Sequence, residues 1–343
     1  MKGIRALARH LDISIGTVSK ALNGRPDINP ETRKRVLEAA ITLGYVANQS
    51  GRSLRQGSTQ TVGFMIESNR DGATDSDNFF MAVFDGVQLA LAKHNLDLLV
   101  LPCASNEDSV AYLRRMVARG IADALIISAT RRNDPRVVLL AGAKIPFLTL
   151  GKPEVPGQPW IELDFEGVAL QSVDRLATRG HREIAVVLPA SDLNLGNLFL
   201  AGYKRGLRKH RIEFDPGLVI RARSSEEGGY ELGSELLKLR RRPTAVLLSY
   251  EILAGGLYRR LNEAAVVPGR DIAIIGFRES PQTRFLVPRL TCFNTSLRDL
   301  GIALAEMLLS QMPAFEDHYP NWPTTKVWPM TLVPGESDAM LVG

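Results

Sequence analysis

From residue 61 onward, the sequence alternates between short apolar runs and longer segments in which apolar residues recur at helical spacing. The short runs predict strands and the longer segments predict helices. The expected strands are TVGFMI, LDLLVLP, ADALIIS and IPFLTL, followed by a second series of REIAVVL, LVIRA, TAVLLS and RDIAIIG. The expected helices lie near 80–94, 106–119, 166–179, 197–209, 226–240 and 251–264. This alternation predicts an α/β fold with parallel sheets. Its repetition predicts two doubly wound units, with a ligand cleft between them at the carboxyl ends of the strands.

The first 45 residues have a different pattern, which predicts three short helices. Ser14 is a good N-cap for the second helix, because its hydroxyl can accept hydrogen bonds from the free amides of the first turn. Gly24 is expected to end that helix. Asn29 is expected to cap the third helix, which Gly44 would stop. The residues expected to face inward are Ile4, Leu7, Ala8, Leu11, Val18, Ala21, Leu22, Val36, Ala39, Ala40 and Leu43. Three short helices with a tight turn between the first two predict a helix-turn-helix head.

The second helix leaves small and polar residues outside its apolar stripe, in the stretch ISIGTVSKALNG. Such residues suit a helix that enters the major groove of DNA, because small side chains let the backbone approach and hydroxyls can bind phosphates. The distribution of charge agrees with this interpretation. Residues 1–57 hold ten Lys/Arg and four Asp/Glu, whereas the rest of the chain holds 32 Lys/Arg and 33 Asp/Glu. A basic head on a near-neutral body favours a polyanionic partner. A helical bundle with an incidental polar face, or a merely solubilising basic surface, remains an alternative.

Other functional classes find little support in the sequence. No nucleotide-binding glycine motif and no GxSxG motif follows any expected strand. The histidines and the two cysteines, Cys103 and Cys292, lack metal or redox spacing, and His181 has no nucleophile beside it, so a structural role is favoured. We therefore expect neither an enzyme nor a metal or other cofactor. No apolar run is long enough to span a membrane, and the start lacks the features of a signal peptide.

The stretch ALARHLDISIGTVSKALNGRPDINPETRKRVLEAAITLGYVAN closely resembles the DNA-binding head of the LacI/GalR family of bacterial transcription regulators. The resemblance implies phosphate contacts from Ser14, Thr17, Ser19 and Asn23. It implies that Ile15, Gly16 and Lys20 occupy the positions that determine which operator sequence is bound. It also implies a protein of the bacterial cytoplasm, associated with the nucleoid.

Residues 48–59 would then form the hinge, which in this family folds into a short helix on the operator. Leu54 matches the leucine that wedges into the minor groove, with Arg52 and Arg55 beside it. Ala47 and Gly51 stand where the family often has proline and alanine, so we expect a weak hinge helix that needs DNA to order. Alternatively, Leu54 packs on the body.

The body resembles the periplasmic-binding-protein-like core of the same family, through LATRGHREIAVV, LAGYKRGL, PTAVLLS, DIAIIGF and VPRLTCFNTSLRDLG. By that resemblance the head covers residues 1–47, the hinge 48–59 and the core 60–343. The first subdomain would comprise about 60–160 and 293–323, and the second about 161–290 and 324–343. The core would form a homodimer, or a tetramer, that presents two heads to a pseudo-palindromic operator.

The cleft departs from the family pattern of sugar-sensing members. The residues at the expected effector positions are Phe79, Phe80, Phe199, Tyr250, Glu251, Arg278 and Thr295. Arg278 stands where an aspartate is usual, and a guanidinium in a closed cleft favours an anion such as a sugar acid. Alternatively, Arg278 pairs with Glu279 or Glu251 and touches no ligand.

The resemblance implies that the effector shifts a population of open and closed clefts and thereby changes operator affinity. Repression with release is the commoner family behaviour and is our expectation. The remaining alternatives are control by a neutral sugar or by a partner protein, and a solute-binding protein of a transporter.

Overall fold

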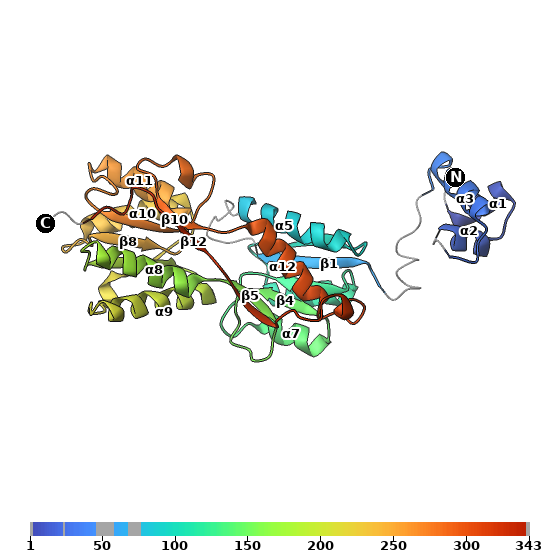
Figure 1. Cartoon of the computed structure of the whole chain (residues 1–343), viewed down its shortest axis with the longest axis horizontal. Helices are drawn as coiled ribbons and strands as arrows, with labels where there is room; N and C mark the ends of the chain where they lie inside the picture. Colours follow the sequence, from blue (N-terminus) through green and yellow to red (C-terminus); the bar gives the residue numbers. More distant parts are fainter. Residues whose placement is uncertain (1–2, 23–24, 46–57, 68–76, 341–343) are drawn as a thin grey trace. The chain divides into compact units, whose positions relative to one another are not determined.

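The computed structural model describes residues 3–22, 25–45, 58–67 and 77–340 (Figure 1). The chain divides into two compact units, Met1–Gln60 and Thr61–Gly343, which we call the head and the core. This division agrees with the change of sequence pattern at residue 61. Among the residues that the structure describes, no helix is long and apolar enough to cross a membrane.

The head contains the three predicted helices: α1 (Ile4–Leu11), α2 (Ile15–Leu22) and α3 (Pro30–Thr42). Two of the predicted caps are confirmed. The Ser14 hydroxyl accepts a hydrogen bond from the Thr17 amide at 3.0 Å, and the Asn29 side chain accepts one from the Glu31 amide at 2.9 Å. The fully buried side chains of Val18, Ala21 and Val36 join the helices around one small apolar core. Gly24 lies outside the described residues.

The core contains two six-stranded sheets, each with helices on both faces. The first sheet has the order β11-β5-β4-β3-β1-β2 and the second the order β12-β10-β9-β8-β6-β7. All the strand pairs are parallel except β10 with β12. The first sheet consists of β1 (Thr61–Glu67), β2 (Asp97–Cys103), β3 (Ala124–Ile127), β4 (Phe147–Leu150), β5 (Trp160–Leu163) and β11 (Thr325–Trp328). The second consists of β6 (Ile184–Pro189), β7 (Val219–Ala222), β8 (Ala245–Leu248), β9 (Ala273–Arg278), β10 (Thr291–Asn294) and β12 (Thr331–Val333).

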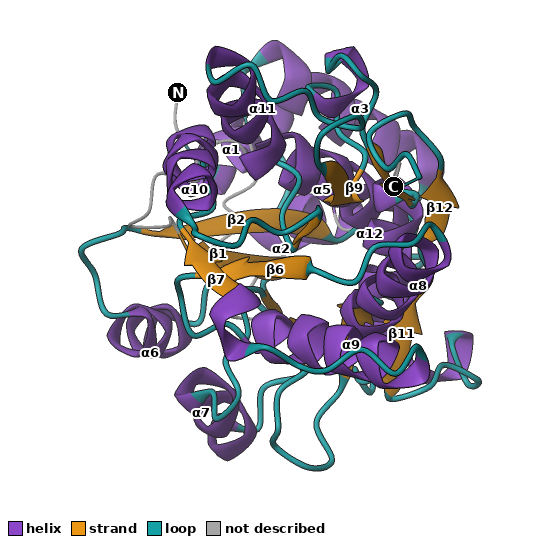
Figure 2. Ribbon diagram, turned by 90° about the vertical axis from the view of Figure 1, so that its left-hand side faces the viewer, coloured by secondary structure: helices purple, strands orange, loops and turns teal. Residues whose placement is uncertain are grey.

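The helices divide between two lobes, one around each sheet. The first lobe contains α5 (Asp77–Ala92), α6 (Ser109–Arg119), α7 (Pro135–Ala143) and α12 (Leu297–Leu309). The second contains α8 (Phe165–Thr178), α9 (Asn194–Lys209), α10 (Glu226–Lys238) and α11 (Leu253–Glu263). Figure 2 shows α8 and α9 on one side of the second sheet and α10 and α11 on the other. The strands bury alternate residues towards each helix layer, as doubly wound sheets do.

Two glycines permit the close packing of α5 against α12. A Cβ added to Gly86 would lie 2.0 Å from the Arg298 carbonyl oxygen, and one added to Gly301 would lie 2.1 Å from that of Val83. Because α12 lies more than 200 residues after α5 in the chain, this contact fixes the return of the chain to the first lobe.

The predicted alternation is confirmed, but the predicted subdomain boundaries need correction. The boundary expected at 160/161 falls within β5, which pairs with β4 and β11 in the first sheet. Strand β11, expected in the second subdomain, also belongs to the first sheet, and the chain enters the second again only at β12. Strand pairing across more than 160 residues, between Trp160 and Thr325, sets these boundaries, and a local pattern cannot show it.

Candidate functional site

Helix α2 presents the small and polar surface that its sequence predicted. Ile15 is 43% exposed although it is apolar, and Ser14, Gly16 and Lys20 are exposed as well. The Ser14 hydroxyl lies 2.9 Å from the Thr17 hydroxyl, so the two oxygens form one polar cluster at the amino end of the helix. A Cβ added to Gly16 would meet only the Ser14 oxygen, at 3.5 Å, which is ordinary contact. Packing within the head therefore does not require glycine at this position.

Lys20 lies near the carboxyl end of α2 and pairs with an acid of the following loop. Its Nζ lies 2.5 Å from Oδ2 of Asp27, and both side chains are about half exposed. The hydrogen bond from Lys20 lowers the pKa of Asp27 below its ordinary value. The sequence predicted a role for Lys20 but not for Asp27, because Asp27 lies in the segment that follows α2 and its position depends on the fold of that segment.

Of the remaining predicted DNA contacts, only Ser19 lies among the described residues. Ser19 is half-buried on α2. The predicted contacts Asn23, Arg52, Leu54 and Arg55, and the predicted hinge, fall largely or wholly outside the described residues.

In the core, a cavity of about 230 Å³ lies between the two lobes. Five of the seven side chains predicted for an effector site line it: Phe79, Phe80, Tyr250, Glu251 and Arg278. Phe165 and Phe277 add a stacked pair of rings to its wall, with centroids 4.2 Å apart. Hydroxyl groups of Ser128, Thr130, Ser224, Ser280 and Thr283 also lie around it. The cavity thus combines aromatic faces with many small hydrogen-bonding groups.

Two predicted effector residues do not line this cavity, and their assignment is corrected. Phe199 is 1% exposed and packs in the apolar core, edge-on to Phe277. Thr295 lies between the lobes, where its hydroxyl donates to the Pro329 carbonyl at 3.0 Å and accepts from the Trp328 indole at 2.9 Å. Both positions were chosen by correspondence with the family. Here Phe199 packs against another aromatic ring, and Thr295 hydrogen-bonds to Trp328 and Pro329, so both side chains have structural roles.

Arg278 has the charge partner that the second interpretation expected, and it also lines the cavity. Its guanidinium forms an ion pair with Glu251 and donates a hydrogen bond to the Glu279 carbonyl at 3.0 Å. It also lies over the ring of Phe79, 5.4 Å from the centroid, so it connects the second lobe to the first. Because the Glu251 carboxylate already neutralises this guanidinium, the pair offers a ligand no net positive charge.

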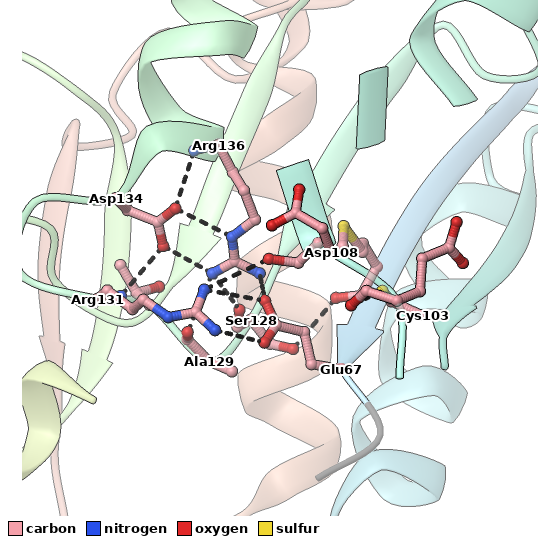
Figure 3. Close-up of polar contacts among 12 residues, drawn as sticks. Glu67, Cys103, Asp108, Ser128, Ala129, Arg131, Asp134 and Arg136 are labelled. Carbon is pink, nitrogen blue, oxygen red and sulfur yellow. Dashed lines mark hydrogen bonds and ion pairs between the residues drawn. The ribbon is translucent and has the colours of Figure 1, made fainter. Parts of the chain in front are cut away.

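A second group of charges borders the cavity in the first lobe, centred on Glu67 (Figure 3). Arg136 is completely buried and donates to Glu67 at 2.6 Å, to both carboxylate oxygens of Asp134, and to the carbonyls of Ser128 and Ala129. Arg131 donates to both oxygens of Glu67, at 3.2 and 2.8 Å. Burial alone would raise the pKa of Asp134, but the hydrogen bonds from Arg136 and from two backbone amides lower it. The network fixes the loop that carries the Ser128 and Thr130 hydroxyls.

Glu162 is another acidic group of the cavity wall, and it forms no ion pair with an arginine among the described residues. It is 6% exposed, and its carboxylate accepts a hydrogen bond from the Lys152 amide at 2.8 Å. Among the described residues it forms no ion pair. Burial raises the pKa of Glu162 to about 7, and the amide hydrogen bonds only partly oppose this rise. Glu162 was not among the residues predicted from the sequence. The alternation of apolar and polar residues in WIEL does not show that this position faces a cavity.

Backbone contacts join the two lobes beside the cavity. The Asn194 amide donates to the Thr130 carbonyl at 3.1 Å, and the Asn194 side chain donates to the Lys152 carbonyl at 2.7 Å. Arg131 and Leu193 form an isolated antiparallel bridge. The loop that Arg136 fixes is therefore also the loop that contacts the second lobe.

His181 has the structural role that its sequence context favoured. It is 3% exposed, and its ring nitrogens lie 3.0 Å from the Thr244 hydroxyl and 3.0 Å from the Ala339 carbonyl. Among the described residues, no group of three or more His, Cys, Asp or Glu side chains could hold a metal ion.

A helix-turn-helix head and a two-lobed core with a cavity between its lobes define a DNA-binding regulator of two functional parts. A family model described as "Bacterial regulatory proteins, lacI family" matches residues 4–48, and one described as "Periplasmic binding protein-like domain" matches 173–337. The chain is 32% identical to the HTH-type transcriptional regulator AglR of Rhizobium meliloti (strain 1021), over 96% of this chain and 92% of the relative. It is 30% identical to RafR of Escherichia coli, over 89% and 90% of the two chains. The chain belongs to the LacI family of transcriptional regulators and is not an enzyme.

Solved structures show the same fold. The lac repressor dimer bound to operator and the anti-inducer ONPF matches with a TM-score of 0.83 at 20% identity, over 97% of this chain and 98% of that one. The complex of the transcriptional regulator CelR with cellobiose matches with a TM-score of 0.72 at 24% identity, over 98% and 99%.

Proposed function

We propose that this regulator is a repressor that binds a pseudo-palindromic operator as a homodimer and that a small molecule in the core cavity controls its operator affinity. The exposed surface of α2 is the observation on which the proposal rests. An isoleucine that is 43% exposed and a glycine that packing does not require have no role within the head. In a DNA groove, Ile15 can contact a thymine methyl group, and Gly16 lets the helix backbone approach the duplex.

In the proposed complex, the hydroxyls of Ser14 and Thr17 bind phosphates at the amino end of α2, where the helix dipole also favours an anion, and the Ser19 hydroxyl binds a phosphate further along the helix. Lys20 donates to a guanine edge. Asn23 adds a phosphate contact, and the hinge residues Arg52, Leu54 and Arg55 act in the minor groove. These contacts explain why the positive charge of the chain is concentrated in its first 57 residues.

For the effector, the cavity favours a neutral polyhydroxylated molecule over the anion that Arg278 suggested in the sequence. Arg278 is paired with Glu251, and Glu67 is held by Arg131 and Arg136. Outside these ion pairs, the wall carries hydroxyl groups, whose oxygens can still accept hydrogen bonds, and the carboxylate of Glu162. Carboxylates accept hydrogen bonds from hydroxyl groups, and aromatic rings suit the apolar faces of a sugar. The cellobiose bound by CelR, a structural neighbour, supports the same class of ligand.

The effector would act by shifting the population of cleft conformations. A ligand that contacts Phe79 of the first lobe and Tyr250 of the second binds most tightly to one arrangement of the lobes. The contacts of Asn194 with Thr130 and Lys152 would form or break with that arrangement. A change in lobe geometry would reach the heads of a dimer and alter operator affinity.

Two measurements test this proposal. Selection from a pool of randomised duplexes should enrich a pseudo-palindrome, and failure to enrich any sequence at low salt would overturn the DNA-binding part. Thermal unfolding with cellobiose, ribose, gluconate and glucose 6-phosphate tests the cavity, because a ligand that binds the native state raises the melting temperature. We expect stabilisation by a neutral sugar. Stabilisation only by the anions would restore the interpretation of Arg278 as an anion-binding group.

A further inference from the structure

The ion pair between Lys20 and Asp27 places an acid beside the lysine that faces the DNA. Lys20 Nζ lies 2.5 Å from Asp27 Oδ2, and the side chains are 55% and 54% exposed. Among the described residues of the head, the ammonium group of Lys20 has no other hydrogen-bond partner. Asp27 lies in the loop that leads to α3, and among the described acids of the head it is the one that forms an ion pair with a side chain of α2.

If α2 reads the operator, the carboxylate beside Lys20 lies near the phosphates of the duplex and is repelled by them. The geometry of the pair gives Asp27 a function that offsets this repulsion. A lysine side chain is a flexible stem with three hydrogen-bond donors on its ammonium group. If one donor is held by Asp27, two donors remain for the O6 and N7 acceptors of a guanine, and the stem is ordered before DNA arrives.

The same pairing reduces the contribution of Lys20 to non-specific binding, that is, to the affinity for DNA of arbitrary sequence. Non-specific binding depends on cations that neutralise phosphates, and Lys20 paired with Asp27 carries no net charge to such a contact. The pair should therefore favour the operator and disfavour other DNA. This inference rests on the proposed role of α2 as the helix that reads the operator.

We propose that Asp27 is a specificity-determining residue that acts by positioning the ammonium group of Lys20 for a base edge in the major groove. Asp27 itself need not touch the DNA. Its contribution lies in the ratio of operator affinity to affinity for mixed-sequence DNA.

The test compares Asp27→Asn with Asp12→Asn, its matched control. Asp12 is exposed at the end of α1 and forms no ion pair with a described residue, so its substitution removes the same charge from the same domain. Asp12 has a φ of 53°, which asparagine also adopts readily. Fluorescence anisotropy of the full chain would measure binding to the duplex that the wild type selects and to a mixed-sequence duplex, over a series of salt concentrations.

Relative to Asp12→Asn, we expect Asp27→Asn to weaken operator binding by about two- to fivefold, the range for an exposed ion pair. Binding to the mixed-sequence duplex should not weaken, because the freed ammonium can contact a phosphate. Misfolding would instead weaken both, and simple charge removal would strengthen both. A repeat of the selection with Asp27→Asn should show relaxed preference at one base pair of each half-site.

A double-mutant cycle completes the test. In a Lys20→Ala background, Asp27→Asn should affect operator binding no more than Asp12→Asn does. Equal effects of Asp27→Asn with and without Lys20, or an unchanged base preference, would overturn the proposal. If the wild type itself selects no sequence, the proposed function fails and this inference fails with it. If the wild type selects an operator but Asp27→Asn behaves like Asp12→Asn, only this inference fails.

Discussion

The polar groups of the head and those of the core cavity differ in where their partners lie in the chain. In the head, Ser14 bonds to Thr17 and Lys20 pairs with Asp27, so partners are three and seven residues apart. Around the cavity, Glu67 pairs with Arg136 and Glu251 with Arg278, across 69 and 27 residues. The polar groups of α2 thus lie on an exposed surface, whereas Glu67, Glu251 and Arg278 at the cavity are neutralised by partners within the core. A charged residue in the cavity is therefore a poor guide to the charge of the ligand.

The largest effect that this comparison predicts is at Arg136, in the buried network. Replacing Arg136 by alanine removes the arginine that pairs with the buried Asp134 and one of the two arginines that pair with Glu67. Removing one partner of a buried ion pair costs about 3–5 kcal/mol, so the free energy of unfolding of the core should fall by that amount in urea denaturation. Arg132→Ala is the control, since Arg132 forms only an exposed pair with Glu154 and should change stability little. Equal losses of stability in the two variants would contradict the claim that the buried charges of the core depend on their internal partners.

The next effect concerns Glu162 and depends on pH. The pKa of Glu162 is about 7 in the folded chain, above its ordinary value of 4.5, so the folded state binds more protons than the unfolded state between these values. The contribution of this group to stability therefore falls as the pH rises from about 4.5 to 7, by roughly 3 kcal/mol at most. Glu162→Gln should be more stable than the wild type at pH 8 and similar to it at pH 4. Denaturant unfolding at both values checks this, and a difference that is the same at pH 4 and pH 8 would contradict it.

The smallest effect is expected in the head, at the cap of α2. Ser14→Ala removes the hydroxyl that accepts from the Thr17 amide and should destabilise the helix by about 1 kcal/mol. Hydrogen exchange of the α2 amides in the full chain would show this as faster exchange, with the core amides unchanged. Ser14→Asp keeps an acceptor at the cap and should restore protection. Unchanged exchange in Ser14→Ala would mean that the cap contributes little to α2.

The same difference explains how much could be predicted from the sequence. The helices of the head and most strands of the core follow from local periodicity, because apolar spacing and caps such as Ser14 and Asn29 act within a few residues. The exposed surface of α2 could be predicted for the same reason. The burial of Phe199 and the position of Glu162 in the cavity wall depend on strands far apart in the chain. For Arg278, the sequence offered Glu251 and Glu279 as partners, and the structure has the ion pair with Glu251. Lysine and aspartate seven residues apart gave no signal for the Lys20–Asp27 pair, because a loop intervenes.

The most direct test of the account is the affinity of Lys20→Ala for the duplex that the wild type selects, measured beside its affinity for a mixed-sequence duplex. A lysine contact with a guanine edge contributes about ten- to a hundredfold in discrimination. We predict a loss of operator affinity in that range, a much smaller loss on the mixed-sequence duplex, and no change in the stability of the core. An operator affinity equal to that of the wild type would contradict the assignment of α2 as the helix that reads DNA.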